Sequence, residues 1–460
     1  MWRRFSAGML VVALGGSSMG CGSDDSSGSS AGGTGGTGAS GGTGGLGGSA
    51  GGGTGGSAGS TACAAPPRKL WTWDLGVMPP ADVQVDATCR GESAHARVYV
   101  ADSAWGSDVT EAKVSAVLAA FDQATPADPS RGIFAIDQET FGDPPDVDGE
   151  PRVLLFYVPM DDYKGYSFDG FFRDDDQAPG ATSNQSEMLH LSSHGAKAVD
   201  SDYMLGVVAH ELVHLITWKY DPADEGWLGE TLAEVAMVRA GYLTDLPAAQ
   251  SYVKATATKP LCVKSYSDYG ATFTFGTYLL DRFGAPFVKS VTQDAKDGRE
   301  SVEAQLPGGL KFGQLFGEFM VATLLDQPKL GDGRFGFDSI DVSGLGSEVV
   351  GKLDGSSGSV DCVAFGGRTL RLNPSGAGKV SVTLTASNLS ELVVHSVVMN
   401  PSSPGSAKVL AQNASAGPMQ IGVGAGESVF LVIAVDPGAA LPSAQGAPVT
   451  QIGYTATFTP

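Results

Sequence analysis

The chain has 460 residues, with 50 Asp and Glu against 29 Lys and Arg, so its net charge is −21. A body this acidic repels the phosphate backbone, which excludes nucleic acid as an expected partner. Glycine supplies 65 residues, and 19 of these fall within positions 22–60, among Ser and Thr. Such a segment cannot bury enough apolar surface to offset its conformational entropy. We therefore expect a disordered tether over residues 22–62.

Residues 1–21 have the organisation of an export signal. Arg3 and Arg4 precede the apolar run 9–14, and small residues then lead to Cys21. The run is too short to span a membrane, but it suits a secretory signal peptide. No other segment approaches the ~20 apolar residues that a membrane helix needs.

The end of this signal resembles that of bacterial lipoproteins, in which the Cys becomes the lipidated N-terminus. Cys21 follows Gly20 and precedes the polar tether, although Ser18 stands where that family usually has Leu. Gly22, rather than Asp, follows the Cys, which in Gram-negative lipoproteins favours the outer membrane. The resemblance implies a lipid anchor on Cys21 at the outer membrane or cell surface; ordinary cleavage and release as a secreted protein is the alternative.

Four further cysteines remain if Cys21 carries lipid. An even number in an exported chain predicts two disulfides. Sequence order favours Cys63–Cys89 and Cys262–Cys362, while two other pairings and unpaired thiols stay open. None of the cysteines has the spacing of a metal site.

The periodicity of residues 63–350 predicts an α+β domain, because strands come first and helices follow. The expected strands are 95–101, 152–159 and 186–191, and the expected helices are 108–123, 202–219, 227–241, 268–283 and 311–325.

The C-terminal region has a different texture. Its β-rich runs are 379–385, 392–398, 428–435 and 451–459, separated by Gly, Pro, Ser and Asn. This spacing is typical of an all-β sandwich or jelly roll. We expect such a domain over 355–460, with the boundary near 351–359.

The most specific pattern in the chain is His-Glu-Leu-Val-His at 210–214, within an apolar helix. Positions four apart lie on one helix face, so His210 and His214 can bind one Zn²⁺ through their ring nitrogens. Glu211 points to the same side and can take a proton from water at the metal. The alternative is a core helix with two hydrogen-bonded histidines.

A catalytic zinc ion needs a third protein ligand and an open position. The extended motif with a third His fails here, because Thr217 and Tyr220 occupy the places of its Gly and His. Glu230 and Glu234 lie one turn apart on the next expected helix. One carboxylate can bind zinc and the other can accept the second N–H of a ligating His, and the residues alone leave open which does which.

The sequence HELVH followed by WLGETLAE resembles the gluzincin metallopeptidases, whose signature is HExxH and then a WLNE-like motif. The resemblance implies a zincin-type metallopeptidase domain over 63–350. It further implies His210, His214 and Glu230 as zinc ligands and Glu211 as general base.

Within the gluzincins, residues 95–340 are most similar to the hyicolysin-type group, by the order and spacing of several stretches. Gly229 replaces the Asn usual before the third ligand, a change beside the ligands rather than among them. Glu234 is then expected to orient a ligand.

An oxyanion stabiliser is needed beside the metal, and gluzincins use a downstream Tyr or His for it. No His lies between positions 214 and 395, so a Tyr is implied. Tyr266, Tyr269 and Tyr278 are candidates, and Tyr269 is favoured because it starts a helix.

Acidic loops are candidate Ca²⁺ sites, although none has the spacing of the twelve-residue calcium loop, and solvated turns are the alternative. They comprise Asp143, Asp146, Asp148 and Glu150, together with 168–170 and 173–176. The strand 186–191 corresponds to one that lines the cleft in gluzincins and can pair with substrate. Its His190 is expected as a surface or supporting residue rather than a functional one.

The sequence thus predicts an exported zinc metalloendopeptidase that acts on a protein or peptide substrate. A second class fits the tether and the β-rich tail: a surface-displayed binding or adhesion protein with an inactive metalloprotease domain. The intact Glu211 argues against that class. Specificity and oligomeric state are not predicted, because they depend on three-dimensional placement.

Overall fold

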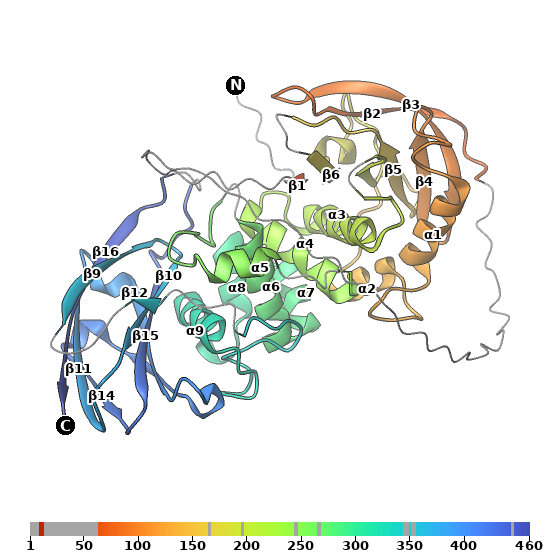
Figure 1. Cartoon of the computed structure of the whole chain (residues 1–460). Helices are drawn as coiled ribbons and strands as arrows, with labels where there is room; N and C mark the ends of the chain where they lie inside the picture. Colours follow the sequence, from red (N-terminus) through yellow and green to blue (C-terminus); the bar gives the residue numbers. More distant parts are fainter. Residues whose placement is uncertain are drawn as a thin grey trace, which may run out of the picture.

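The computed structural model describes residues 9–12 and 63–460, apart from 164–166, 195–196, 243–246, 265–267, 344–348, 351–355 and 443–445. Cys21, the tether over 22–62 and Tyr266 lie outside the described residues, and so does the predicted signal peptide except for residues 9–12. Figure 1 shows the described chain as a curved sheet, a central group of helices and a further pair of sheets, in chain order.

The N-terminal part is a seven-stranded sheet with strand order β1-β6-β7-β5-β4-β3-β2. β4, β5 and β7 are parallel neighbours, and the other pairings are antiparallel. Every residue of β5 and β7 is buried, as expected for strands covered on both faces. The strands are Met9–Val12 (β1), Arg68–Asp74 (β2), Ala81–Glu92 (β3), Ala96–Ala101 (β4), Val153–Val158 (β5), Ser167–Phe172 (β6) and Met188–Ser192 (β7).

The sheet curls so that β2, at one end, packs against β6 and β7 near the other. The Trp73 ring stacks on Phe171 with centroids 4.9 Å apart. Thr72 Oγ1 lies 3.1 Å from His190 Nδ1. Strands far apart in the sheet order are therefore in direct contact across the concave face.

Nine α-helices occur in the described part of the chain. They are Glu111–Asp122 (α1), Ile133–Thr140 (α2), Asp202–Tyr220 (α3), Gly226–Ala240 (α4), Pro247–Val253 (α5), Tyr269–Phe283 (α6), Ala285–Thr292 (α7), Gly298–Gln305 (α8) and Phe312–Leu325 (α9). α3 packs on β6, β7 and α4, and α4 packs on α6. The strands and helices expected from periodicity in this region are confirmed, with ends within about three residues.

Local chemistry fixes where the central helices begin and end. The Ser201 side chain caps α3 by accepting from Met204 N, and Asp268 caps α6 by accepting from Ala271 N. Gly241 ends α4 in the left-handed conformation, with φ 79°. α3 is buried continuously from Met204 to Ile216, in agreement with its apolar sequence.

The C-terminal region consists of two sheets, β13-β12-β15-β10-β8 and β14-β11-β16-β9. All pairings are antiparallel except that of the two-residue β8 with β10. Alternate residues of both sheets point into one hydrophobic cluster between them. The strands are Val349–Val350 (β8), Ser357–Val363 (β9), Gly367–Leu372 (β10), Gly378–Thr385 (β11), Leu392–Met399 (β12), Lys408–Gln412 (β13), Met419–Val423 (β14), Ser428–Val435 (β15) and Val449–Thr459 (β16).

α9 connects the helices to these sheets by packing on β12 and β15. A Cβ on Gly317 would lie 2.6 Å from Val393 Cγ1, so only glycine allows this approach. The Arg299 guanidinium adds a two-pronged ion pair to Asp436, at 2.9 and 3.1 Å.

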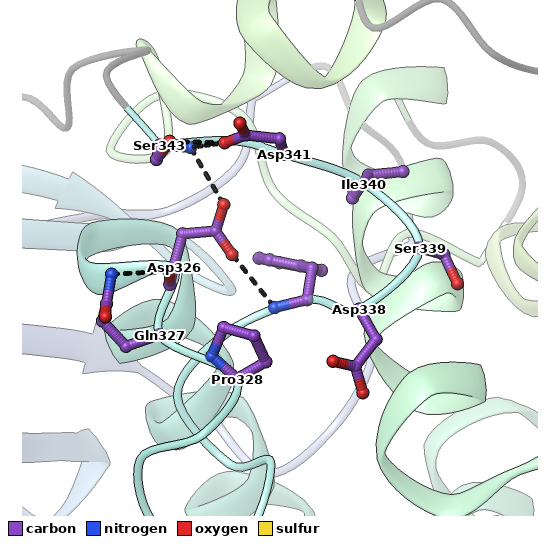
Figure 2. A pocket seen from close by; sticks show the side chains of 9 residues that line it. Asp326, Gln327, Pro328, Asp338, Ser339, Ile340, Asp341 and Ser343 are labelled. Atoms are coloured by element: carbon purple, nitrogen blue, oxygen red, sulfur yellow. Dashed lines mark hydrogen bonds between the residues drawn. The ribbon is translucent and has the colours of Figure 1, made fainter. Parts of the chain in front are cut away.

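The loop after α9 is organised by one carboxylate (Figure 2). Asp326 accepts hydrogen bonds from the backbone N–H groups of Phe337, Val342 and Ser343, at 3.0, 2.7 and 2.9 Å. The same loop lines a polar hollow of about 470 Å³. Because backbone donors satisfy the Asp326 carboxylate, we assign it a structural role.

One disulfide is present in the described part of the chain, joining Cys63 and Cys89 with Cα atoms 5.8 Å apart. The first predicted pairing is therefore confirmed. A stable disulfide fits an exported protein, because disulfides persist in oxidising compartments. No described helix is both long enough and apolar enough to cross a membrane.

The second predicted pairing is wrong in this structure, where Cys262 and Cys362 are both buried thiols. Cys262 packs in the cluster that also contains the central helices, and Cys362 packs in the cluster between the two C-terminal sheets. Each fills its own core as a small apolar side chain. Burial raises the pKa of the Cys262 thiol well above its usual range.

β6 approaches α3 closely at Gly170, and this generates a test of the packing. A Cβ there would lie 2.8 Å from Val207 Cγ1 and 3.0 Å from Glu211 Cγ. We expect Gly170→Ala to lower the free energy of unfolding by about 1–3 kcal/mol, through overpacking. Thermal unfolding followed by circular dichroism measures this. Gly422→Ala is the control, because its Cβ would meet nothing within 4 Å; equal effects of the two variants would contradict the packing.

Candidate metal centre

The histidines of α3 meet a carboxylate of α4 in the buried seam between the two helices. His210 Nε2 lies 3.1 Å from His214 Nε2 and 3.4 Å from Glu230 Oε2. His214 Nε2 lies 3.9 Å from Glu230 Oε1. One potential ligand atom from each of the three residues lies within 4.8 Å of the others, and all three residues are buried. The structure thus brings together the three predicted zinc ligands.

The donor set and its spacing fit a zinc ion. Ligand atoms 2.0–2.1 Å from a tetrahedral zinc are ~3.3 Å apart, close to the separations of the three side chains. Glu230 Oε2 is buried and has no hydrogen-bond partner in the described part of the chain. Two imidazoles and one carboxylate are a usual set for a catalytic zinc with an open position. The residues present therefore fit the metal that the sequence predicts.

Burial also keeps the ligands in the required protonation state. It lowers the pKa of His210 to about 3 and that of His214 to about 4. Both rings are therefore neutral at pH 7, as metal ligands must be. Burial raises the pKa of Glu230, while the charge of His214 and a hydrogen bond from Tyr269 lower it.

Glu211 is completely buried beside this group. The backbone N–H of Phe172 in β6 approaches its carboxylate, although neither oxygen has a partner within normal hydrogen-bond geometry among the described residues. Burial raises the pKa of Glu211 well above the usual range, the charge of Glu230 raises it further, and the Phe172 N–H lowers it. A nearby cation would lower the pKa of such a carboxylate, because opposite charge favours the ionised form.

Glu234 and Tyr269 also lie at the group. Glu234 Oε1 is 3.6 Å from His210 Nδ1, a separation beyond hydrogen-bond distance. His210 Nδ1 has no hydrogen-bond partner among the described residues. Burial, together with the charge of Glu230, raises the pKa of Glu234 to about 8. The hydrogen bond of Tyr269 to Glu230 places this residue beside a predicted ligand.

Two of the remaining predicted positions can be compared with the structure directly. Tyr278 is buried in the core, where its hydroxyl donates to Arg334 O at 2.9 Å. A Cβ on Gly229 would lie 3.9 Å from His214 Nδ1, an ordinary contact. There is therefore room for a side chain at position 229, where the gluzincin pattern usually has Asn.

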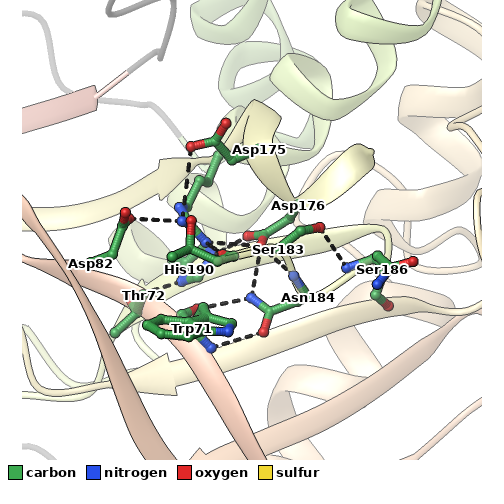
Figure 3. A network of polar contacts seen from close by, with 12 residues as sticks. Trp71, Thr72, Asp82, Asp175, Asp176, Ser183, Asn184, Ser186 and His190 are labelled. Atoms are coloured by element: carbon green, nitrogen blue, oxygen red, sulfur yellow. Dashed lines mark hydrogen bonds and ion pairs between the residues drawn. The ribbon is translucent and has the colours of Figure 1, made fainter. Parts of the chain in front are cut away.

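His190 lies outside the metal centre, in a separate polar network shown in Figure 3. His190 Nε2 is 2.9 Å from Asp176 Oδ2, and Asp176 Oδ1 pairs with Arg173 Nη1 at 3.0 Å. The Asn184 amide pairs with both backbone groups of Trp71, at 2.8 Å each. This buried network holds the exposed edge of β2 against the loop after β6. Of the two expected roles of His190, surface or supporting residue, the surface position is wrong, because the curled sheet covers the ring.

The prediction that strand 186–191 can pair with substrate is also wrong. β7 is hydrogen-bonded to β5 on one side and to β6 on the other, so it has no open edge. β6 occupies the outer position instead, and its outer neighbour is β1, formed by residues 9–12.

The acidic loops separate into different roles. Asp146 and Asp148 come together with Glu187, a residue 39 positions beyond Asp148. Glu150 is instead paired with Arg97 and Arg152. The residues at 168–170 lie in β6. Within 173–176, Arg173 and Asp176 belong to the buried network around His190, and the exposed Asp175 lies 3.9 Å from Arg173 Nη2.

Gly170 and Tyr203 lie at the candidate metal centre without having been predicted for it. The close approach of Gly170 allows β6 to cover Glu211. Tyr203 donates to Asp169 Oδ2 at 3.0 Å; burial raises the pKa of Tyr203, and the charges of Asp169, Glu234 and Glu211 raise it further. A glycine inside an apolar strand pattern is the signal that could have indicated a close backbone approach.

Comparison with known proteins does not extend this description. No protein-family model and no curated protein matches the chain. Similar solved structures include the g-type lysozyme inhibitors PliG of Salmonella Typhimurium (9% identity, covering 25% of this chain and 100% of that chain) and Aeromonas hydrophila (15%, 24% and 96%). Another is a Yersinia pseudotuberculosis-derived mitogen (12%, 23% and 85%). Each has a TM-score of 0.17, too low to support an argument.

The geometry predicts that zinc content depends on the three ligands. His210→Ala, His214→Ala and Glu230→Ala should each lower bound zinc from one ion per chain to about one-tenth or less. The two remaining ligands would bind zinc too weakly to retain it through dialysis. Elemental mass spectrometry of the dialysed protein measures this. His95→Ala is the control, since His95 is exposed and paired with Asp122. Full zinc content in the ligand variants would exclude this centre.

Proposed function

We propose that the protein is an exported zinc-dependent metalloendopeptidase of the gluzincin type. One observation carries the proposal: the ligand atoms of His210, His214 and Glu230 converge within 4.8 Å, with the buried Glu211 beside them. Two neutral histidines, one ligating carboxylate and a second carboxylate for proton transfer make up the side chains that zinc-assisted peptide hydrolysis needs.

The side chains have distinct parts in this proposal. Zinc, when bound, supplies a Lewis acid that polarises a carbonyl group and lowers the pKa of water. The Glu211 carboxylate accepts the proton of the attacking water and returns it to the leaving amine. Glu234 faces His210 Nδ1 and favours the orientation in which Nε2 points to the metal.

Tyr269 is the proposed oxyanion stabiliser. It starts α6, is partly buried and hydrogen-bonds Glu230. A phenol at this position can donate to the oxygen of a tetrahedral intermediate, and such a donor contributes about 10²–10³-fold to kcat.

The edge of β6 supports a peptide as the substrate. β1 pairs with this edge in antiparallel fashion, with Leu10 opposite Gly170. Residues 9–12 belong to the predicted signal peptide, so cleavage of the signal would open the edge to an extended peptide. A peptide on this edge would run past Gly170, and therefore past Glu211 directly beneath it.

We further propose that a lipid on Cys21 anchors the protein to the outer membrane or cell surface. Labelling of expressing cells with an alkyne fatty acid should mark the wild type and leave Cys21→Ser unmarked and released into the soluble fraction. Equal labelling of both proteins, or release of the wild type, would exclude the anchor.

Glu211→Gln tests the proposed function most simply. The amide is nearly isosteric but cannot accept the proton, so we expect kcat for casein hydrolysis to fall about 10²–10⁴-fold. Zinc content should remain near one ion per chain. In the same assay, Tyr269→Phe should lower kcat about 10²–10³-fold with little change in KM.

Glu300→Gln is the matched control, because Glu300 is an exposed residue of α8, and it should keep full activity. Full activity of Glu211→Gln would contradict the mechanism. A different outcome is a wild-type protein that binds one zinc ion per chain and cleaves no member of a peptide library. That result would favour the alternative, a surface-displayed binding or adhesion protein with an inactive metalloprotease domain.

A further inference from the structure

A second group of oxygen ligands lies away from the zinc ligands, where the loop between α2 and β5 meets the start of β7. Asp146 and Asp148 are exposed residues of the loop, whereas Glu187 is only 1% exposed. One carboxylate oxygen from each of the three residues lies within 4.8 Å of the other two. We call these three residues the acidic cluster.

Glu187 gives the acidic cluster an unsatisfied buried group. Its Oε1 accepts a hydrogen bond from Val147 N, so the loop folds over the carboxylate. Its Oε2 is inaccessible to solvent and has no hydrogen-bond partner in the described part of the chain. Leaving a buried carboxylate oxygen without a partner costs free energy, more than for a neutral group.

In the part of the chain that the structure describes, no basic side chain pairs with the carboxylates of the cluster. The nearby Glu150 takes up both Arg97 and Arg152. Lys219 approaches the same loop, but its Nζ donates to Pro144 O at 3.1 Å.

The loop's own backbone engages one oxygen of each exposed aspartate. Asp146 Oδ1 accepts from Gly149 N, and Asp148 Oδ1 accepts from Glu150 N, both at 2.8 Å. These bonds hold the two carboxylates in place before any cation arrives. Two preorganised carboxylates beside a buried carboxylate with an unpartnered oxygen can receive a cation.

We propose that the acidic cluster binds one Ca²⁺ ion. All its donors are carboxylate oxygens, which suit hard cations and not zinc. An irregular set of three carboxylates completed by water suits Ca²⁺, whereas Mg²⁺ demands near-ideal octahedral geometry. Exported proteins commonly bind Ca²⁺ with Kd values of about 10⁻⁴–10⁻³ M.

The ion would connect the loop to both the sheet and the zinc-binding helix. Glu187 leads directly into β7, and the other end of the loop is held by the last turn of α3. There, Asp143 N donates to Tyr220 Oη at 3.2 Å, next to the contact made by Lys219. Binding should therefore stabilise the folded protein and the position of α3.

Direct calorimetric titration of CaCl₂ into zinc-loaded protein, prepared in calcium-free buffer, tests the proposal. The wild type should bind one Ca²⁺ per chain. At about 10 mM Ca²⁺, some 100-fold above a Kd of about 10⁻⁴ M, its Tm should rise by several degrees. Glu187→Gln, and separately the exposed pair Asp146→Asn with Asp148→Asn, should lose both the binding and the Tm shift.

Asp143→Asn is the matched control, because it removes one charge from the same loop outside the acidic cluster. It should bind Ca²⁺ as the wild type does. Absence of binding by the wild type, unchanged binding by the cluster variants, or Mg²⁺ binding of equal affinity would each overturn the proposal. If Glu187→Gln fails to fold, the exposed aspartate pair decides. Failure of this proposal can be told apart from failure of the proposed function, because Ca²⁺ binding is measured directly and the two sites share no residue.

Discussion

The burial of three carboxylates beside two histidines is the constraint on which the centre of this molecule depends. Glu211, Glu230 and Glu234 are each less than a tenth exposed, and in the described part of the chain none forms an ion pair with Lys or Arg. Buried ionised carboxylates without compensation shift their pKa and become neutral. A divalent cation between His210 and His214 would restore their charge. The same ion would explain why the buried faces of α3 and α4 carry these polar residues.

The fold supplies the rigidity that such a centre needs. α3 is held between β6 on one side and α4 on the other, and α6 places Tyr269 against the ligand on α4. β2, at the far end of the curled sheet, holds β7 in place through the network around Asp176 and His190. The proposed Ca²⁺ would add a further connection, from the end of α3 to the start of β7. The network around His190 and the proposed Ca²⁺ site thus act on the position of α3 rather than on substrate.

The sequence predicts best what depends on neighbours along the chain. Helical spacing predicts that His210, Glu211 and His214 share one side of a helix. Side-chain caps next to the first residues fix where α3 and α6 begin, at Ser201 and Asp268. What depends on distant contacts was not predictable. Asp169 and Gly170 interrupt the apolar sequence of β6, and only the packing of β6 on α3 explains these two residues. Glu187 joins Asp146 and Asp148 because β7 and the preceding loop meet in space. The thiols of Cys262 and Cys362 show that an even cysteine count does not decide pairing once side chains pack in separate cores.

Diffraction data collected at the zinc absorption edge, from crystals of the zinc-loaded protein, test the central claim most directly. The account predicts one strong anomalous peak between α3 and α4, about 2.0–2.2 Å from His210 Nε2, His214 Nε2 and a Glu230 oxygen. It also predicts an open position facing Glu211. An anomalous peak elsewhere, or a fourth protein ligand that closes the site, would contradict the account.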